Sequence, residues 1–183
     1  INNITNEKVL RLELSAAPVS LDPTIIDDYY SAMEISKVYE GLVEYHYLER
    51  PLQIVPLLAE SMPEVSSDEL TYTFKIKKNV FFQDNACFKD GKGRELTAED
   101  FVFSIKRVAD PKIQSSLFAF FDDKIIGLNE WREKNSNNEK VNYDEEIEGI
   151  KAIDKYTLQF KLKRKWPQFM HILTMPHCVA IPK

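Results

Sequence analysis

The sequence has few of the features that identify the most easily recognised classes of protein. It contains only two cysteines, Cys87 and Cys178, far apart and outside any CxxC or metal-ligand spacing. Two buried free thiols are the main interpretation, and a disulfide is the alternative, which would require an oxidising compartment. No stretch approaches the roughly 20 apolar residues of a membrane span. A basic-then-apolar leader is also missing, so any export signal is expected to have been removed.

Positive charge is not in excess either. The formal net charge is -5 over 183 residues, whereas nucleic-acid-binding domains usually carry a basic footprint. The one basic run, "KLKRKW" at 161–166, alternates so that its lysines share the outer face of a predicted strand. We interpret it as a solvated surface rather than a nucleic-acid or lipid contact, and we expect no nucleic-acid partner.

Catalytic signatures are missing as well. The sequence has no GxSxG, HExxH or GxGxxG motif and no P-loop. His171, His177 and Cys178 could hold a metal, but the two histidines do not have helical i,i+4 spacing, so surface or hydrogen-bonded histidines are the preferred interpretation. We therefore expect no enzyme activity, no metal and no cofactor.

What the sequence does contain is a series of alternating and helical patterns. Period-two alternation predicts strands, and the last two arms that flank Asp154-Lys155 predict a hairpin. The predicted strands are 8–14, 71–77, 79–83, 148–153, 156–162 and 178–182. The polar segments 84–95 and 132–146 are predicted to be loops, the second one exposed or mobile.

Two S/T-x-x-E/D patterns predict helix starts of the capping-box type. Ser31 and Glu34 are expected to begin a helix whose apolar face extends to Leu42. Gly41 is expected to mark the region where this helix ends. Thr97 and Asp100 are expected to begin a second helix, which Pro111 ends. Its predicted core face is Phe101, Ile105 and Val108. A short third helix is expected to start with Pro167 at its first position. Strands and helices are thus mixed, which indicates an α/β or α+β fold.

Six segments in a fixed order resemble one family. They are "SLDP" (20–23), "VYEGLV" (38–43), "IVPLLAESMP" (54–63), "TYTFKIKKNVFF" (71–82), "LTAEDFVFSIKRVADP" (96–111) and "GIKAIDKYTLQFKLKRKWPQF" (149–169). Their order resembles the family 5 extracellular solute-binding proteins, which are the oligopeptide- and dipeptide-binding receptors of ABC importers. The resemblance covers the chain from about residue 8 to residue 183.

The resemblance implies an α/β fold of the type II periplasmic-binding-protein class (cluster C), in which two lobes close on a ligand. Residues 1–45 would be the first part of lobe I, 46–170 its extra subdomain and 171–183 a return to lobe I, with the chain truncated and the second lobe absent. The implied protein lies outside the cytoplasmic membrane, either as a periplasmic protein or at the cell surface as a lipid-anchored lipoprotein. Its implied partners are a peptide ligand and the membrane permease of an ABC importer, and it is expected to be a monomer.

The same resemblance implies where ligand would bind. The fourteen residues between "SLDP" and "VYEGL" match the spacing of the oligopeptide receptors, whose equivalent connection lies at the cleft. Asp27 and Tyr29 fall at ligand-contacting positions, and Asp28 and Tyr30 adjoin them. In "SSLFAFF" (115–121), Phe118 and Phe120 are further candidates. The alternatives are that the tyrosines and phenylalanines pack in the core and that the aspartates only form a turn.

Three functional alternatives remain open from the sequence. A receptor of the same fold could bind nickel, haem or sugar instead of peptide. A regulatory protein could use the fold, although no basic helix-turn-helix adjoins it here. An enzyme could use it too, but we find no nucleophile and base that converge.

Overall fold

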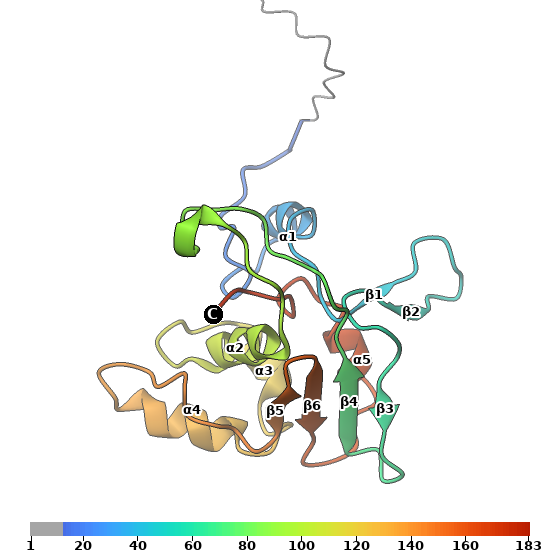
Figure 1. The fold of residues 1–183 in the computed structure, drawn as a ribbon, viewed down its shortest axis with the longest axis vertical. Coiled ribbons are helices and arrows are strands. Elements are labelled where there is room, and N and C mark those ends of the chain that lie inside the picture. The colour runs from blue at the N-terminus through green and yellow to red at the C-terminus, as the bar shows by residue number, and fades with distance from the viewer. Residues whose placement is uncertain (1–12) are drawn as a thin grey trace, which may run out of the picture.

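The structure, a computed structural model, describes residues 13–183 (Figure 1). The predicted strand at 8–14 lies outside these residues except for Glu13 and Leu14, which are not in a strand. The helices are α1 (Tyr29–Ile35), α2 (Ala98–Ala109), α3 (Phe118–Phe121), α4 (Leu128–Ser136) and α5 (Phe169–Ile172), with a 3-10 turn, η1 (Lys89–Gly91). The strands are β1 (Val43–Tyr45), β2 (Ile54–Pro56), β3 (Glu64–Val65), β4 (Thr71–Lys75), β5 (Ile150–Asp154) and β6 (Thr157–Lys161).

A four-stranded antiparallel sheet in the order β3-β4-β6-β5 forms the body of the molecule. The predicted hairpin is confirmed as β5 and β6, and β4 pairs with β6 so that Phe74 lies opposite Leu158. Helix α2 packs against β5 and β6, and α4 contacts α2. The separate hairpin of β1 and β2 projects from this body (Figure 1).

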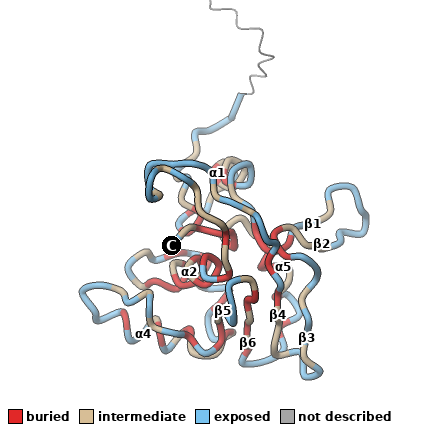
Figure 2. Tube along the Cα trace, in the orientation of Figure 1, coloured by how far each residue is buried: buried red, intermediate tan, exposed pale blue. Residues whose placement is uncertain are grey.

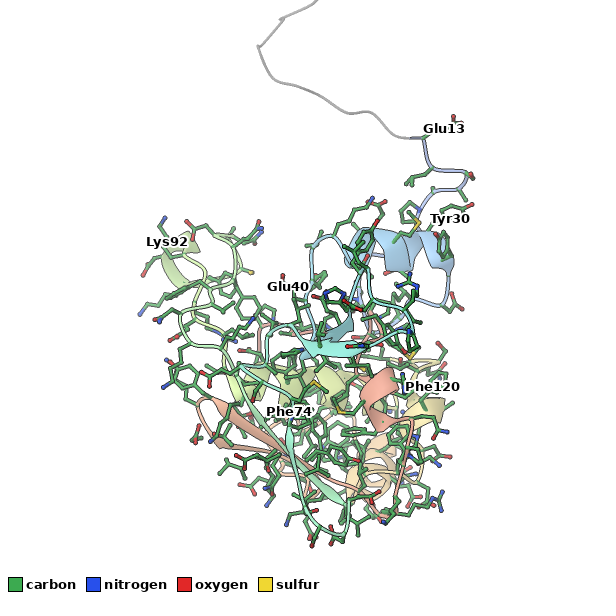
Figure 3. All side chains as sticks on the ribbon, turned by 90° about the vertical axis from the view of Figure 1, so that its right-hand side faces the viewer. Glu13, Tyr30, Glu40, Phe74, Lys92 and Phe120 are labelled. Carbon is green, nitrogen blue, oxygen red and sulfur yellow. The ribbon has the colours of Figure 1, made fainter. Side chains whose placement is uncertain are left out.

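Aromatic side chains fill the core beside the sheet. Phe74, Phe160 and Phe169 are almost fully buried, and Figure 3 shows Phe74 inside the lower part of the molecule. The Phe169 ring of α5 packs edge-on against two rings of the sheet. Its centroid lies 4.8 Å from that of Tyr72 in β4 and 5.2 Å from that of Phe160 in β6. The buried positions concentrate on α2, the sheet and the C-terminal segment (Figure 2). This core supports the segments around Gly41 and Val179, which pair with each other.

Helix α2 agrees with its prediction in detail. It begins at Ala98 after Thr97, with a capping box between Thr97 and Asp100, and ends before Pro111. Its predicted core face is confirmed, because Phe101, Ile105 and Val108 are all buried. The helix therefore starts and stops where its local sequence dictates.

Helix α1 differs from its prediction. It starts at Tyr29 and ends at Ile35, and its N-cap is Asp28, whose Oδ1 accepts a hydrogen bond from the backbone N–H of Ser31 at 2.8 Å. The predicted Ser31 capping box is wrong because the Ser31 hydroxyl accepts from the backbone N–H groups of Val19 (2.9 Å) and Ser20 (3.2 Å) instead. The predicted extension to Leu42 is also wrong, and Val38 is largely exposed.

Five further predictions need correction. The segment 132–146 is not all loop, because residues 132–136 form the second half of α4. The buried side chains of Leu128 and Trp131 hold this helix against the core. Residues 79–83 and 178–182 form isolated bridges rather than strands. The third helix, α5, begins at Phe169, two residues after Pro167. Cys178 is buried as predicted, but Cys87 is exposed; both thiols are free.

The C-terminal segment returns to the N-terminal part of the chain. Gly41 and Val179 form an antiparallel bridge, and the Ala180 N–H donates to the Glu40 carbonyl at 3.0 Å. Gly41 permits this approach because a Cβ on it would lie only 3.2 Å from the carbonyl oxygen of Cys178. Segments 40–42 and 178–181 therefore lie side by side.

Candidate functional site

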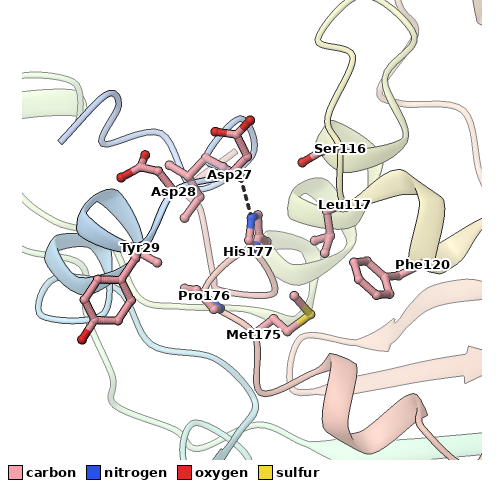
Figure 4. Close-up of a pocket in the computed structure, with 11 residues that line it drawn as sticks. Asp27, Asp28, Tyr29, Ser116, Leu117, Phe120, Met175, Pro176 and His177 are labelled. Carbon is pink, nitrogen blue, oxygen red and sulfur yellow. Dashed lines mark hydrogen bonds between the residues drawn. The ribbon is translucent and has the colours of Figure 1, made fainter.

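Three segments that are distant in the sequence line an open cavity of about 390 Å³. The first is the turn and start of α1, the second leads into α3, and the third follows α5. Figure 4 shows His177 between the turn that carries Asp27 and the segment that carries Ser116 and Phe120. The lining comprises Ile26, Asp27, Asp28, Tyr29, Ala32, Ser116, Leu117, Phe120, Met175, Pro176 and His177.

The turn before α1 is held by its own polar side chains. Asp22 Oδ1 accepts from the Thr24 N–H at 3.0 Å, and Asp22 Oδ2 pairs with Arg107 of α2 at 2.5 Å. On the other side, His177 Nε2 lies 2.8 Å from the Ile26 carbonyl oxygen. The turn is therefore anchored both to α2 and to the segment after α5.

The Ile26 contact fixes the protonation of His177. A carbonyl oxygen only accepts, so Nε2 carries a proton, and in the neutral ring Nδ1 is then the unprotonated nitrogen. Nδ1 is buried and has no hydrogen-bond partner among residues 13–183. Burial lowers the pKa of His177, because it disfavours the charged imidazolium. The side chain is thus neutral at pH 7.

The two aspartates of the turn differ in their surroundings. Hydrogen bonds from the side chain and backbone of Ser31 lower the pKa of Asp28, which keeps this carboxylate charged while it caps α1. Asp27 is exposed, and Figure 4 shows it directly above His177. Within the described part of the chain, neither aspartate forms an ion pair.

Four of the six residues predicted to contact ligand line this cavity, namely Asp27, Asp28, Tyr29 and Phe120. Tyr30 lies outside the lining and packs edge-on against Tyr29, with ring centroids 5.6 Å apart. Phe118 also lies outside the lining, and the Arg132 guanidinium covers its ring at 4.2 Å. These two residues belong to the neighbouring packing rather than to the cavity wall.

Sequence reasoning missed the third segment, Met175 to His177. Its pairing with Ile26 joins residues at opposite ends of the chain, and no local pattern indicates such a contact. A second cavity of about 320 Å³ shares Tyr29, Ala32, Met175 and Pro176 with the first, so the two hollows adjoin. Met175 and Pro176 of the missed segment therefore line both neighbouring recesses.

Residues 13–183 contain no cluster of three or more His, Cys, Asp or Glu side chains that could hold a metal ion. His171 and His177 are used separately: His171 Nδ1 lies 2.7 Å from the Tyr45 hydroxyl, and His177 bonds Ile26. None of the described helices is both long and apolar enough to cross a membrane.

Comparison with known families decides the class of the protein. Residues 53–182 match the family model described as "Bacterial extracellular solute-binding proteins, family 5 Middle". The chain belongs to this family. Its members are binding proteins that share the type II periplasmic-binding-protein fold, which confirms the family and fold implied by the six segments.

Two of the similar proteins are named for the peptides that they bind. The chain is 31% identical over 172 residues to a dipeptide-binding protein of Lactococcus lactis, covering 94% of this chain and 28% of that protein. It is 36% identical over 162 residues to the oligopeptide-binding protein AmiA of Streptococcus pneumoniae, covering 87% and 22%. The family 5 chain thus spans less than a third of the curated relatives it matches.

A solved structure shares the arrangement. Listeria monocytogenes OppA bound to peptide superposes with a TM-score of 0.75 at 25% identity, covering 97% of this chain and 31% of that one. The DppA protein of Helicobacter pylori in complex with the peptide STSA gives a TM-score of 0.70 at 25% identity. The cavity therefore lies within a portion of fold that larger peptide-bound proteins also contain.

Proposed function

We propose that this family 5 chain forms part of a receptor that captures peptides outside the cytoplasmic membrane and delivers them to the permease of an ABC importer. The cavity between α1, α3 and the segment after α5 would be one wall of its peptide site. The observation that carries the proposal is the convergence of Asp27, Tyr29 and Phe120 on one cavity. The sequence predicts each of these three residues to contact ligand.

The chemistry of this wall suits a peptide. Tyr29 is 71% exposed and Phe120 is 45% exposed, which leaves two aromatic surfaces available for contact. Aromatic rings offer large apolar contact area at little cost in conformational entropy, and the tyrosine hydroxyl adds a hydrogen-bonding group. Carboxylates nearby accept hydrogen bonds from N–H donors, which a peptide supplies along its backbone and at its amino terminus.

One wall alone gives little affinity, because a binding site gains most when both sides of the ligand lose water. We expect this chain by itself to show no heat above background in calorimetry with mixed short peptides. A micromolar dissociation constant for the isolated chain would contradict that expectation.

The test uses the complete protein that carries this chain. We expect mass spectrometry of the purified protein to detect bound peptides, and calorimetry with those peptides to give saturable heat. Tyr29→Ala and Phe120→Ala should each weaken binding by roughly 5- to 30-fold, as for aromatic contacts at the centre of an interface. Tyr47→Ala and Phe81→Ala, which remove exposed aromatics outside the cavity, are the matched controls.

A second cargo class has one observation in its favour. The chain is 27% identical over 180 residues to an Escherichia coli protein named "Probable deoxycholate-binding periplasmic protein YgiS". A co-purified amphipathic small molecule in place of peptide, with no heat from any peptide, would replace the peptide proposal by this one. Nickel, haem or sugar in the same assay would do the same for those cargoes.

A further inference from the structure

A third cavity, of about 220 Å³, shares no lining residue with the two recesses beside α1. Helix α2 forms one side of it, and the segment that leads into β5 and β5 itself form the other. Three lysines from separate parts of the chain line it, namely Lys106, Lys151 and Lys183. This concentration of cationic side chains distinguishes it from the cavity proposed for peptide, whose lining within 13–183 contains no Lys or Arg.

Lys106 of α2 is a buried cationic side chain. The residue is only 5% exposed, and its Nζ donates to the carbonyl oxygens of Tyr143 at 2.8 Å and Glu145 at 2.7 Å. It forms no ion pair with any carboxylate of the described residues. Burial disfavours the charged form and lowers the pKa of Lys106. An ammonium group has three N–H donors, so one remains for a partner in the cavity that Lys106 lines.

The carboxylates around this cavity lie farther out than the buried ammonium. Asp144 pairs with Lys183 at 2.7 Å, and Glu146 pairs with Lys151 at 3.3 Å. The side chains of these two acids are 86% and 83% exposed, so both belong to the outer rim. Glu99, the remaining acid of the lining, is exposed as well. The inner part of the cavity therefore carries a positive charge without a bound counterion.

Apolar side chains complete the inner surface. Val102 of α2, Ile147 and Ile150 line the cavity and are almost fully buried. Ala152 of β5 also belongs to the lining, and its short side chain leaves room beside the others. A hydrocarbon group placed against these residues would lose its contact with water, which is favourable.

A buried ammonium beside an apolar surface defines the group that would fit. A carboxylate accepts a charge-assisted hydrogen bond from the ammonium and supplies the missing counterion. A short hydrocarbon part on the same molecule covers the apolar surface. A cationic ligand would be repelled by Lys106, and a neutral one would leave the buried charge uncompensated.

We propose that this third cavity binds a small organic carboxylate, whose carboxylate group pairs with Lys106 and whose hydrocarbon part lies against Val102, Ile147 and Ile150. The site goes beyond the proposed peptide-receptor function, because it shares no residue with the peptide cavity and does not depend on it.

The experiment titrates the complete protein that carries this chain with butyrate and follows the ligand by saturation-transfer NMR. We expect saturable binding with a dissociation constant on the order of 1 mM, in keeping with so small a ligand. Butyramide has the same shape without the charge, and it should bind about tenfold more weakly, because it loses the hydrogen bond between charged groups.

Two variants assign the binding to this cavity. Lys106→Met removes the ammonium, keeps an unbranched side chain, and should abolish the preference for butyrate over butyramide. This change also breaks the bonds to Tyr143 and Glu145, so Ala152→Leu provides an independent variant that fills the cavity and keeps Lys106. It should weaken butyrate binding at least tenfold. Lys92→Met, which removes an exposed lysine outside the lining, is the matched control and should bind as the wild type does.

Three results would overturn the inference: no saturable binding of butyrate to the wild type, equal affinity for butyrate and butyramide, or butyrate binding that Ala152→Leu leaves unchanged. If Lys106→Met does not fold, the comparison of the two ligands and the Ala152→Leu variant still decide. None of these results bears on the peptide receptor, which the peptide titrations test separately.

Discussion

Asp22 Oδ2 and Arg107 Nη2 lie 2.5 Å apart and tie the turn before α1 to the last turn of α2. The same aspartate closes the turn through the Thr24 N–H. The Asp22 carboxylate therefore stabilises the turn and also attaches it to α2, the helix that packs on the sheet. Asp27 and Tyr29 follow Asp22 a few residues later in the chain and line the cavity. The Asp22–Arg107 pair therefore positions one edge of the cavity.

Arg107→Ala removes that tether. The pair is partly exposed, so we expect only about 1 kcal/mol or less of lost stability. Peptide affinity of the complete protein should fall several-fold, because the turn no longer holds one arrangement. Arg107→Lys should restore much of the affinity. Lys92→Ala, which breaks the exposed pair with Asp84, should change neither quantity; an Arg107→Ala protein with unchanged affinity would exclude the positioning role.

His177→Gln should change the pH dependence of stability. Burial lowers the pKa of His177 below its ordinary value of 6.5, so the unfolded chain binds this proton more readily than the folded chain. The free energy of unfolding therefore falls as the pH drops below about 6.5. Glutamine can still donate to the Ile26 carbonyl but does not titrate.

Urea unfolding between pH 7 and pH 5 measures this difference. The wild type should lose more stability than His177→Gln over that interval, and the two curves should run parallel above pH 7. Parallel curves throughout would show that the histidine protonates equally easily in both states.

The two thiols should differ in reactivity. Burial raises the pKa of Cys178 to about 12, so its reactive thiolate is scarce, whereas Cys87 is exposed. Iodoacetamide at pH 8 should modify Cys87 rapidly and Cys178 only after unfolding, as read by peptide mass spectrometry. Cys87→Ser should leave a native protein that takes up no label, and rapid labelling of that variant would contradict the buried position.

Asp100→Ala should cost more stability than any change at the surface. Its carboxylate is fully buried, accepts from the Thr97 N–H at 2.8 Å and pairs with Arg94. Arg94 is partly exposed, so solvent weakens the pair, and we expect a loss of about 2–4 kcal/mol. Chemical unfolding measures it, with Asp68→Ala, an exposed carboxylate, as the control.

The two capping patterns show how far local sequence determines this fold. Thr97 and Asp100 begin α2 because the local bonds are the best ones available to them. Ser31 fits the same pattern, but its hydroxyl binds the backbone of Val19 and Ser20, eleven to twelve residues away. Asp28 then caps α1 in its place. The difference is a tertiary contact, which the pattern does not contain.

The candidate site divides in the same way. The spacing after "SLDP" predicts Asp27 and Tyr29, and the aromatic run at 115–121 predicts Phe120. Each prediction depends on one short segment of sequence, and all three residues line the cavity. Met175 to His177 became visible only in the fold, since their place depends on the return of the chain to residues 40–42. Helix α4 was missed because its polar faces outweigh the buried Leu128 and Trp131 in the sequence.

The bridge between Gly41 and Val179 has an evolutionary consequence. The two bridge partners lie side by side, so residues 42–178 leave and return at one point. We call residues 42–178 the excursion, and residues 13–41 and 179–183 the stem. The stem supplies the wall formed by residues 26–29 and Ala32, and the excursion supplies the other two walls, which contain Ser116, Leu117 and Phe120 and residues 175–177. Insertions or substitutions in the excursion can therefore change two walls of the cavity while the wall supplied by the stem is inherited unchanged.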